Sequence, residues 1–167
     1  MRSPRLERAM ATCSPRGVAL RAGVGAHGAR WVEVPLHTAS EANWTGPLRE
    51  KILRKREQRT HTRLLLRSTL GAPPKPPLVV QLTRLEAAQH ADDDNAVAAL
   101  KHVRDGVADW LGVDDGRAGG VLWAYAQEAT PGRFGVRIEI VPGGRVCPAC
   151  AGRRWVPPEQ HAGDGGA

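Results

Sequence analysis

The sequence lacks a long hydrophobic run, and this absence excludes one class of protein. No apolar stretch approaches the roughly 18 residues that a membrane-spanning helix needs, so we expect a cytoplasmic protein with no membrane partner. Cysteine is scarce, with Cys13, Cys147 and Cys150 only. An odd number with one close pair does not form a disulfide framework, which favours a reducing, intracellular setting. No signal peptide is expected, because residues 1–30 contain no apolar core segment.

Aspartate is absent from residues 1–89, and the charge of the chain is therefore uneven. This part has 16 basic residues and 6 glutamates, whereas residues 90–167 have 8 basic and 11 acidic residues. The formal charges are +10 (16 − 6) and −3 (8 − 11), which give the +7 of the whole chain. A basic half favours a polyanion partner, because lysine and arginine neutralise phosphates. Arginine outnumbers lysine 20 to 4, so a genome rich in arginine codons is the alternative explanation.

The length of 167 residues and the composition predict one folded domain between two irregular ends. Residues 1–29 contain arginine, alanine, glycine and proline without periodicity, and we expect a disordered basic arm or an upstream extension of the true start. Residues 30–141 should form the folded domain. Residues 142–167 are rich in glycine and proline and should form a flexible tail.

Hydrophobic periodicity within the domain predicts an α+β fold, with a small mixed sheet of about four strands and two main helices packed on it. The expected strands are 31–36, 78–85, 121–127 and 134–141, and the expected helices are 47–70 and 95–111. The last two strands should form an antiparallel hairpin through the turn at Thr130-Pro131-Gly132. Asp93 or Asp94 is a natural N-cap for the second helix. Its apolar stripe comprises Ala96, Val97, Leu100, Val103, Val107, Trp110 and Leu111.

The first helix is strongly basic between its apolar ends. Positions 49 to 67 contain eight basic residues but only two acidic ones, Glu50 and Glu57. We expect this helix to contact nucleic acid, and the alternative is a solvated surface with local ion pairs. The predicted DNA-binding residues are Arg49, Lys51, Arg54, Lys55, Arg56, Arg59 and Arg63.

Acidic residues gather before and after the second helix. Asp92, Asp93 and Asp94 are consecutive, so their mutual repulsion must be balanced by solvent, a base or a hard cation such as magnesium. At 100° per residue, Asp94, Lys101 and Asp105 fall on one stripe opposite the apolar face, and Asp105 can pair with Lys101.

A second acidic pair, Asp114-Asp115, follows the helix. The helix is about 25 Å long, so the two acidic groups can meet only across a fold-back or a subunit interface. The alternative explanation is a helix cap followed by a surface ion pair.

This segment resembles the signature of the RusA-type Holliday junction resolvases. In that family a strand ends in Asp-x-Asp-Asn, the following helix carries a lysine, and an Asp-Asp pair lies after the helix. The matching positions are Asp92, Asp94 and Asn95, then Lys101, then Asp114-Asp115. The family's lysine is the third residue after the asparagine, whereas Lys101 is the sixth. A three-residue insertion would explain this difference and would move the lysine by roughly 4.5 Å along the helix axis.

The resemblance implies a homodimeric, magnesium-dependent endodeoxyribonuclease that resolves Holliday junctions or other branched DNA, in a bacterial or phage-infected cell. It implies that Asp92, Asp94 and Asp115 bind the metal, with Asp114 as an alternative ligand and Mn²⁺ as a substitute ion. It also implies that Lys101 lies near the scissile phosphate. The catalytic set is thus Asp92, Asp94, Lys101 and Asp115. Two alternatives stay open: a non-catalytic DNA-binding protein on the same fold, and an interaction protein whose basic helix binds an acidic partner.

Three further features concern metal binding and the packing of aromatic residues. Cys147 and Cys150 form a CxxC pair, but a zinc site needs two more ligands, and only His161 and the remote Cys13 are candidates, so we expect no structural zinc. His90 lies near the acidic run and is expected to be solvated. The aromatic residues Trp123 and Tyr125 share one face of a strand and are expected in the core or a dimer interface.

Overall fold

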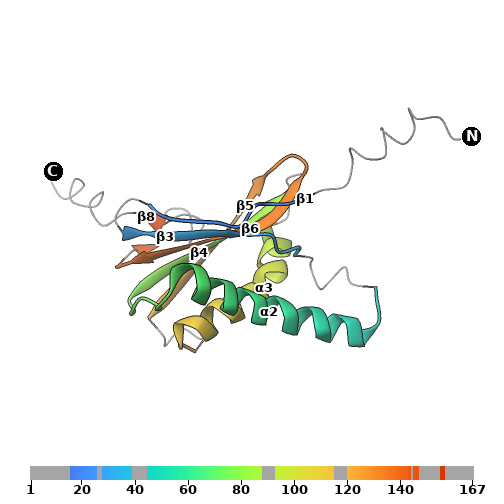
Figure 1. The fold of residues 1–167 in the computed structure, drawn as a ribbon, viewed down its shortest axis with the longest axis horizontal. Coiled ribbons are helices and arrows are strands. Elements are labelled where there is room, and N and C mark those ends of the chain that lie inside the picture. Colours follow the sequence, from blue (N-terminus) through green and yellow to red (C-terminus); the bar gives the residue numbers. More distant parts are fainter. Residues whose placement is uncertain are drawn as a thin grey trace, which may run out of the picture.

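The fold is a mixed β-sheet with two long helices on one of its faces. The computed structural model describes residues 16–25, 28–38, 45–87, 93–114, 120–143, 145–146 and 155–156. In these ranges the strands are β1 (Arg16–Gly17), β2 (Arg21–Val24), β3 (Arg30–Val34), β4 (Leu78–Glu86), β5 (Val121–Ala129), β6 (Arg133–Pro142), β7 (Arg145–Val146) and β8 (Trp155–Val156). The helices are α2 (Leu48–Leu70) and α3 (Asp93–Leu111). Both lie below the sheet in Figure 1, and the predicted α+β class is confirmed.

The sheet has the strand order β2-β3-β6-β4-β5, and β1 pairs with the beginning of β6. β6 runs antiparallel to both β3 and β4, whereas β5 runs parallel to β4. The parallel pair is connected through α3, the usual way to join parallel strands. The four predicted strands are all present, and β7 and β8 pair separately within the segment predicted to be a flexible tail.

The predicted hairpin of the last two strands is wrong, because β4 lies between β5 and β6. The turn between them passes over the end of β4, where the backbone N–H of Thr130 donates to the carbonyl oxygen of Glu86 at 2.6 Å. β4 is buried on both faces almost along its whole length. A strand that is buried on both faces is expected in the middle of a sheet, and β4 has a neighbouring strand on both sides.

The N-terminal segment predicted to be a disordered arm contributes two strands to the sheet. β2 pairs with β3, and Gly23 lies opposite Trp31. A Cβ atom at position 23 would lie 2.9 Å from the Trp31 ring, so glycine leaves room for the indole. β2 was not foreseen because its four residues show no hydrophobic alternation.

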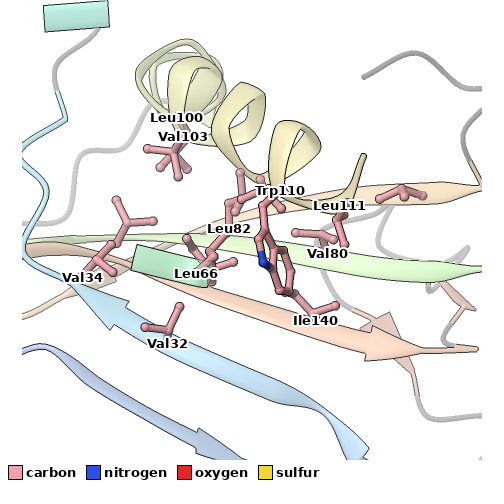
Figure 2. Close-up of a cluster of buried hydrophobic side chains, with 14 of the residues drawn as sticks. Val32, Val34, Leu66, Val80, Leu82, Leu100, Val103, Trp110, Leu111 and Ile140 are labelled. Atoms are coloured by element: carbon pink, nitrogen blue, oxygen red, sulfur yellow. The ribbon is translucent and has the colours of Figure 1, made fainter. Parts of the chain in front are cut away.

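The main core lies between the sheet and the helices (Figure 2). In Figure 2, Leu82 of β4 lies beneath Leu100 and Val103 of α3, and Val80 of β4 lies beside Leu111. Val80, Leu82, Leu100 and Val103 are fully buried. The predicted apolar stripe of α3 is confirmed at Ala96, Leu100, Val103, Val107, Trp110 and Leu111. Val97 is the exception, since 42% of it is exposed. The α3 stripe is therefore narrower than its sequence suggests, and Val97 lies on its flank.

An arginine is buried at the carboxyl end of β4. Arg84 donates from Nε to Thr38 Oγ1 at 3.1 Å and from Nη2 to the Thr38 carbonyl oxygen at 2.9 Å, and it forms an ion pair with Glu86. Burial lowers the pKa of the Arg84 guanidinium, and the charge of Glu86 opposes this shift. These contacts fix the segment after β3 against the end of β4.

The sheet face away from the helices carries a charged group centred on Arg137 of β6. Arg137 Nε donates to Glu33 Oε1 at 2.9 Å, and its Nη1 donates to Glu128 Oε2 at 2.6 Å. These bonds link β3, β6 and β5 across the sheet. Burial raises the pKa of the nearby Glu139 carboxyl, Arg137 opposes that shift, and Glu128 adds to it.

Candidate nucleic-acid interface

Helix α2 carries basic side chains on two flanks, and their burial differs. Residues seven apart in a helix return to nearly the same side. The first flank is exposed and consists of Arg49, Arg56, Arg63 and Arg67, which we call the exposed arginine flank. The second flank is half-buried and consists of Lys51, Arg54 and Lys55, each of which interacts with other groups of the protein. The predicted DNA-binding set therefore divides, and its exposed arginines are the ones that present their charge to solvent.

Arg59, another predicted DNA contact, joins the two helices. Its Nε and Nη2 donate to Asp109 Oδ2 and Oδ1 of α3 at 2.6 and 2.7 Å. The hydrogen bond from Arg59 holds the pKa of the Asp109 carboxyl below its ordinary value. A bidentate pair of this kind fixes orientation as well as charge. Arg59 thus orders the surface between α2 and α3, while 53% of its side chain stays exposed.

A groove of about 300 Å³ runs beside this pair, and we call it the α2–α3 groove. It is lined by Arg59, Lys101, Asp105, Ala108, Asp109, Val113 and Asp114. Three residues singled out from the sequence, Lys101, Asp105 and Asp114, therefore border one concave surface. The exposed arginine flank continues from it through Arg63 and Arg67, which line a neighbouring cavity with Asp109 and Trp110.

The end of α3 explains how Asp114 reaches the groove. Gly112 has a φ of +68°, a left-handed conformation that glycine adopts without strain. The backbone N–H of Val113 then donates to the Ala108 carbonyl oxygen at 3.1 Å. This turn reverses the chain, so Asp114 returns beside the last turns of the helix. This reversal extends only along the C-terminal part of α3, so it does not bring Asp114 to the acidic residues at the other end of the helix.

Asp105 does not pair with Lys101 as predicted. Its Oδ2 lies 3.4 Å from Nδ1 of His102, three residues earlier, and this pair carries charge on both partners only when the imidazole is protonated. Lys101 is exposed, and within the described ranges no ion pair to its ammonium group is seen. Its charge therefore faces solvent at the edge of the groove.

The other predicted carboxylates lie at the opposite end of α3. Helix α3 begins at Asp93, so Asp93 and Asp94 are in its first turn and neither is the N-cap. Asp92 and Asp115 lie outside the described residues. Positions 94 and 105 are separated by roughly 16 Å along the helix axis. Among the side chains that the structure describes, no three acidic, histidine or cysteine residues come together.

Trp123 and Tyr125 pack against the core, as expected, and an arginine covers them. Arg104 of α3 lies 5.1 Å from the Trp123 ring centre and donates from Nη1 to the Tyr125 hydroxyl at 3.4 Å. This cover places α3 directly over β5. The residues Cys13, Cys147, Cys150, His90 and His161 lie outside the described part of the chain, so the expectations for them are not tested.

Two residues of this surface, Asp109 and Arg67, were not among the predicted site residues. Asp109 follows Asp105 by four residues and continues the acidic stripe of α3, so the helical spacing contained this signal. Arg67 follows Arg63 by four residues on the exposed arginine flank, and the same spacing rule would have included it. The partner of Asp109 could not be inferred, because it depends on how the two helices cross.

Comparison of this chain with family models, with curated proteins and with solved structures finds no significant match. In the described part, neither helix has both the length and the apolar character needed to cross a membrane.

Proposed function

We propose that the protein is a magnesium-dependent, structure-selective endonuclease that cuts four-way junctions or other branched DNA as a homodimer. One observation carries this proposal. Exposed arginines of α2 and the group formed by Lys101, Asp105 and Asp114 border the same surface. Such a surface can bind a phosphate backbone and place one phosphodiester beside carboxylates and a lysine.

The arginines supply affinity that does not depend on sequence. The exposed arginine flank extends over 19 residues of α2, from Arg49 to Arg67, and the two end residues are about 27 Å apart along the helix axis. Guanidinium groups bind phosphate oxygens in a bidentate manner and release condensed counterions. Contacts of this kind position a duplex arm without reading its bases, as selection of DNA by its branched shape requires.

The chemistry of the donor set fits magnesium, since carboxylate oxygens are the ligands that hard divalent cations prefer. Asp92, Asp94 and Asp115 would hold it, with Asp114 as the alternative to Asp115. The ion would supply an activated water and neutralise charge on the phosphate. Asp114 shares a groove with Asp105, and position 94 lies roughly 16 Å from Asp105 along the helix axis. The proposed ligand set therefore requires that Asp94 and Asp114 at one ion come from different subunits of the proposed homodimer.

The remaining roles belong to side chains of the chain itself. The exposed ammonium group of Lys101 would stabilise negative charge that develops on the phosphoryl oxygens. The pair Arg59–Asp109 would hold the two walls of the groove at a fixed separation. Arg63 and Arg67 would hold the backbone of the arm that leaves the groove.

The test uses the purified full-length protein and a synthetic four-way junction, with magnesium and with EDTA. We expect paired nicks that need magnesium, and Asp94→Asn should abolish cutting while junction binding is retained. Lys101→Gln should lower the nicking rate more than it lowers affinity. The proposal would be refuted if the wild-type protein neither bound nor cut the junction.

A DNA-binding protein without catalysis is the second candidate, and the exposed arginine flank favours it independently of the carboxylates. Binding by these arginines requires neither the metal nor the displaced lysine. The same experiment separates the two candidates. Tight and selective junction binding by the wild type, with no nicks at any magnesium or manganese concentration, would establish a binding protein.

A further inference from the structure

Helix α2 carries half of the large apolar side chains that are exposed in the described part of the chain. Four of the eight belong to it, namely Leu48, Ile52, Leu53 and Leu64. Two of these four border a single groove of about 550 Å³, which is lined by Leu53, Arg56, Glu57, Thr60, His61 and Leu64. These six residues all belong to α2, so the groove is an open face of one helix. We call it the leucine groove.

The leucine groove has the residue spacing of a coiled-coil seam. Leu53, Glu57, Thr60 and Leu64 follow one another at intervals of four, three and four residues, which places them along one side of the helix. The two leucines are roughly 16 Å apart along the helix axis. On its opposite side, α2 packs against α3 and β3 with its buried residues Gln58, Thr62 and Leu66. A straight face of this length, with an apolar side chain at each end, fits another helix.

The middle of the seam is polar, and this excludes one kind of occupant. Glu57 and Thr60 are both exposed between the two leucines. A helix that lies in a membrane surface buries the centre of its apolar face in lipid, and the carboxylate of Glu57 makes that burial costly. In a pair of helices, a polar residue in the seam instead specifies the register of the two partners.

Arginines follow one side of this seam. Arg49, Arg56 and Arg63 of the exposed arginine flank recur every seven residues, directly beside the seam positions. Charges in such a row select the partner helix and its orientation. Helix α2 has eight basic and two acidic residues, a formal charge of +6 (8 − 2), so a second copy of α2 is repelled. The complementary occupant is an acidic helix.

Segments of this chain outside the described ranges do not have the composition of that helix. Their large apolar residues are few, namely Met1, Leu6, Met10 and Trp44. Residues 1–15 contain three arginines and one glutamate, so they are basic, and residues 39–44 contain only one large apolar residue. No such segment combines negative charge with two apolar anchors. The occupant therefore belongs to another protein.

We propose that the leucine groove binds an acidic amphipathic helix of another protein. Apolar side chains of that helix pack beside Leu53 and Leu64, and its carboxylates pair with Arg56 and Arg63. Because the exposed arginine flank is also the surface that we propose for DNA, the bound helix excludes DNA from α2. This exclusion rests on the function proposed above, whereas the binding of the helix does not.

The first experiment measures the binding of a synthetic acidic peptide to the full-length protein by fluorescence anisotropy, without DNA. The peptide has three heptads, with leucine at the a and d positions except for a glutamine at the central a position. Glutamate at every e and g position places carboxylates beside the arginines in either orientation. The control is a peptide of the same composition in scrambled order. It should bind at least about tenfold more weakly, because it has equal charge but no apolar stripe to bury.

Variants of the leucines test whether the peptide occupies the groove. Leu53→Ser/Leu64→Ser should raise the dissociation constant of the ordered peptide by at least about tenfold, because the exposed half of each leucine is no longer buried on binding. Leu20→Ser/Leu122→Ser is the matched control and should bind as the wild type does. Its leucines are 48% and 50% exposed, against 47% and 50% for Leu53 and Leu64. Thermal unfolding checks that both variants are folded.

Variants of the arginines test the charge row beside the seam. Arg56→Gln/Arg63→Gln should weaken binding of the ordered peptide more than Arg21→Gln/Arg133→Gln does. Both variants remove two exposed charges, but the second pair lies on β2 and β6. Equal losses in the two variants would show that only the net charge of the protein attracts the peptide, and would overturn the proposed pairing.

The second experiment adds the ordered peptide to the protein bound to a labelled four-way junction. We expect the peptide to release the DNA from the wild type. Leu53→Ser/Leu64→Ser should resist release at the same peptide concentration, while its affinity for DNA changes by less than about twofold, because leucine does not contact phosphate. A peptide that binds the protein without releasing the DNA would overturn the exclusion.

The outcomes separate the groove from the proposed function. Equal binding of the ordered and scrambled peptides, or equal losses in the groove and control leucine variants, would overturn the docking site. Leucine-dependent binding to vesicles of phosphatidylglycerol and phosphatidylcholine, without binding of the peptide, would overturn it in favour of a membrane. Leucine-dependent peptide binding by a protein that binds no junction DNA would support the groove while refuting the proposed function.

Discussion

A Cβ atom built on Gly106 of α3 would lie 2.7 Å from Cβ of Thr62 on α2. It would also lie 2.5 Å from the Arg59 carbonyl oxygen, so the two helices cross in direct contact at this point. Real Cβ atoms do not approach a backbone oxygen so closely. Because Gly106 has no side chain, the two helices can approach closely at this point, and this contact sets the width of the α2–α3 groove.

Gly106→Ala should destabilise the protein by about 1–3 kcal/mol, because the helices must separate to admit the methyl group. In an isolated helix the same change would stabilise the helix by about 1 kcal/mol. A loss of stability in the protein would therefore show that α2 and α3 are in close contact at Gly106. Urea unfolding at neutral pH measures it. Thr60→Ala on the exposed side of α2 serves as the control and should be neutral or slightly stabilising. A stabilised Gly106→Ala variant would show that the helices are farther apart than described.

Arg84→Met should lower the free energy of unfolding by about 3–5 kcal/mol, because it removes the cation beside Glu86 and the donors to Thr38. The double variant Arg84→Met/Glu86→Leu should recover much of this loss, since no half-buried charge is then left behind. A chemical denaturation series compares the two. Equal losses in both variants would indicate that the hydrogen bonds to Thr38 dominate over the ion pair.

Glu139→Gln should stabilise the protein at pH 7 by up to about 1 kcal/mol. The folded protein raises the pKa of this carboxyl, so it binds a proton that the unfolded chain releases, and stability falls as pH rises through that window. The gain should vanish below about pH 4, where the carboxyl is protonated in both states. Thermal unfolding from pH 3 to 8 tests this, with the exposed Glu57→Gln as the control for charge. A gain that persists at acid pH would contradict the assigned cause.

The triple variant Arg56→Gln/Arg63→Gln/Arg67→Gln should weaken DNA binding more than Lys51→Gln/Arg54→Gln/Lys55→Gln. Both remove three charges, but the first removes exposed guanidinium groups and the second removes half-buried ones. The slope of log K against log salt should fall by up to about 3 in the first variant, at about 0.9 per lost phosphate contact. Fluorescence anisotropy with a labelled junction at several salt concentrations measures both slopes. A larger change in the second variant would move the interface to the other flank of α2.

The sequence predicted those elements whose signal is local. The stripe from Leu100 to Trp110 gave α3 its buried face, and the alternation of Val136, Ile138 and Ile140 gave β6 its position against the core. Which strands pair with each other depends on contacts between distant parts of the chain, so local sequence patterns do not predict it. The turn after β5 has the length of a hairpin loop, yet it spans a third strand, because β4, which is buried almost along its whole length, takes β5 and β6 as its two neighbours.

The candidate site was predicted in part for the same reason. Helical spacing placed Lys101 and Asp105 on one stripe, and the glycine after α3 allowed Asp114 to return to it. The partner of Asp109 could not be predicted, because it depends on the contact between Gly106 and Thr62. Asp105 was predicted to pair with Lys101, four residues earlier in the helix, but it pairs with His102, three residues earlier.

The position of β6 has a consequence for how the chain is made. It is the last long strand in the described sequence, yet it joins the pair β2–β3 to the pair β4–β5. The hydrogen bond from Arg137 to Glu33 spans 104 residues. During synthesis the two pairs stay unconnected until residues 133–142 leave the ribosome. Until that point both pairs expose strand edges to solvent and to other nascent chains. The nascent chain is therefore most prone to aggregation before the ten residues of β6 have been synthesised.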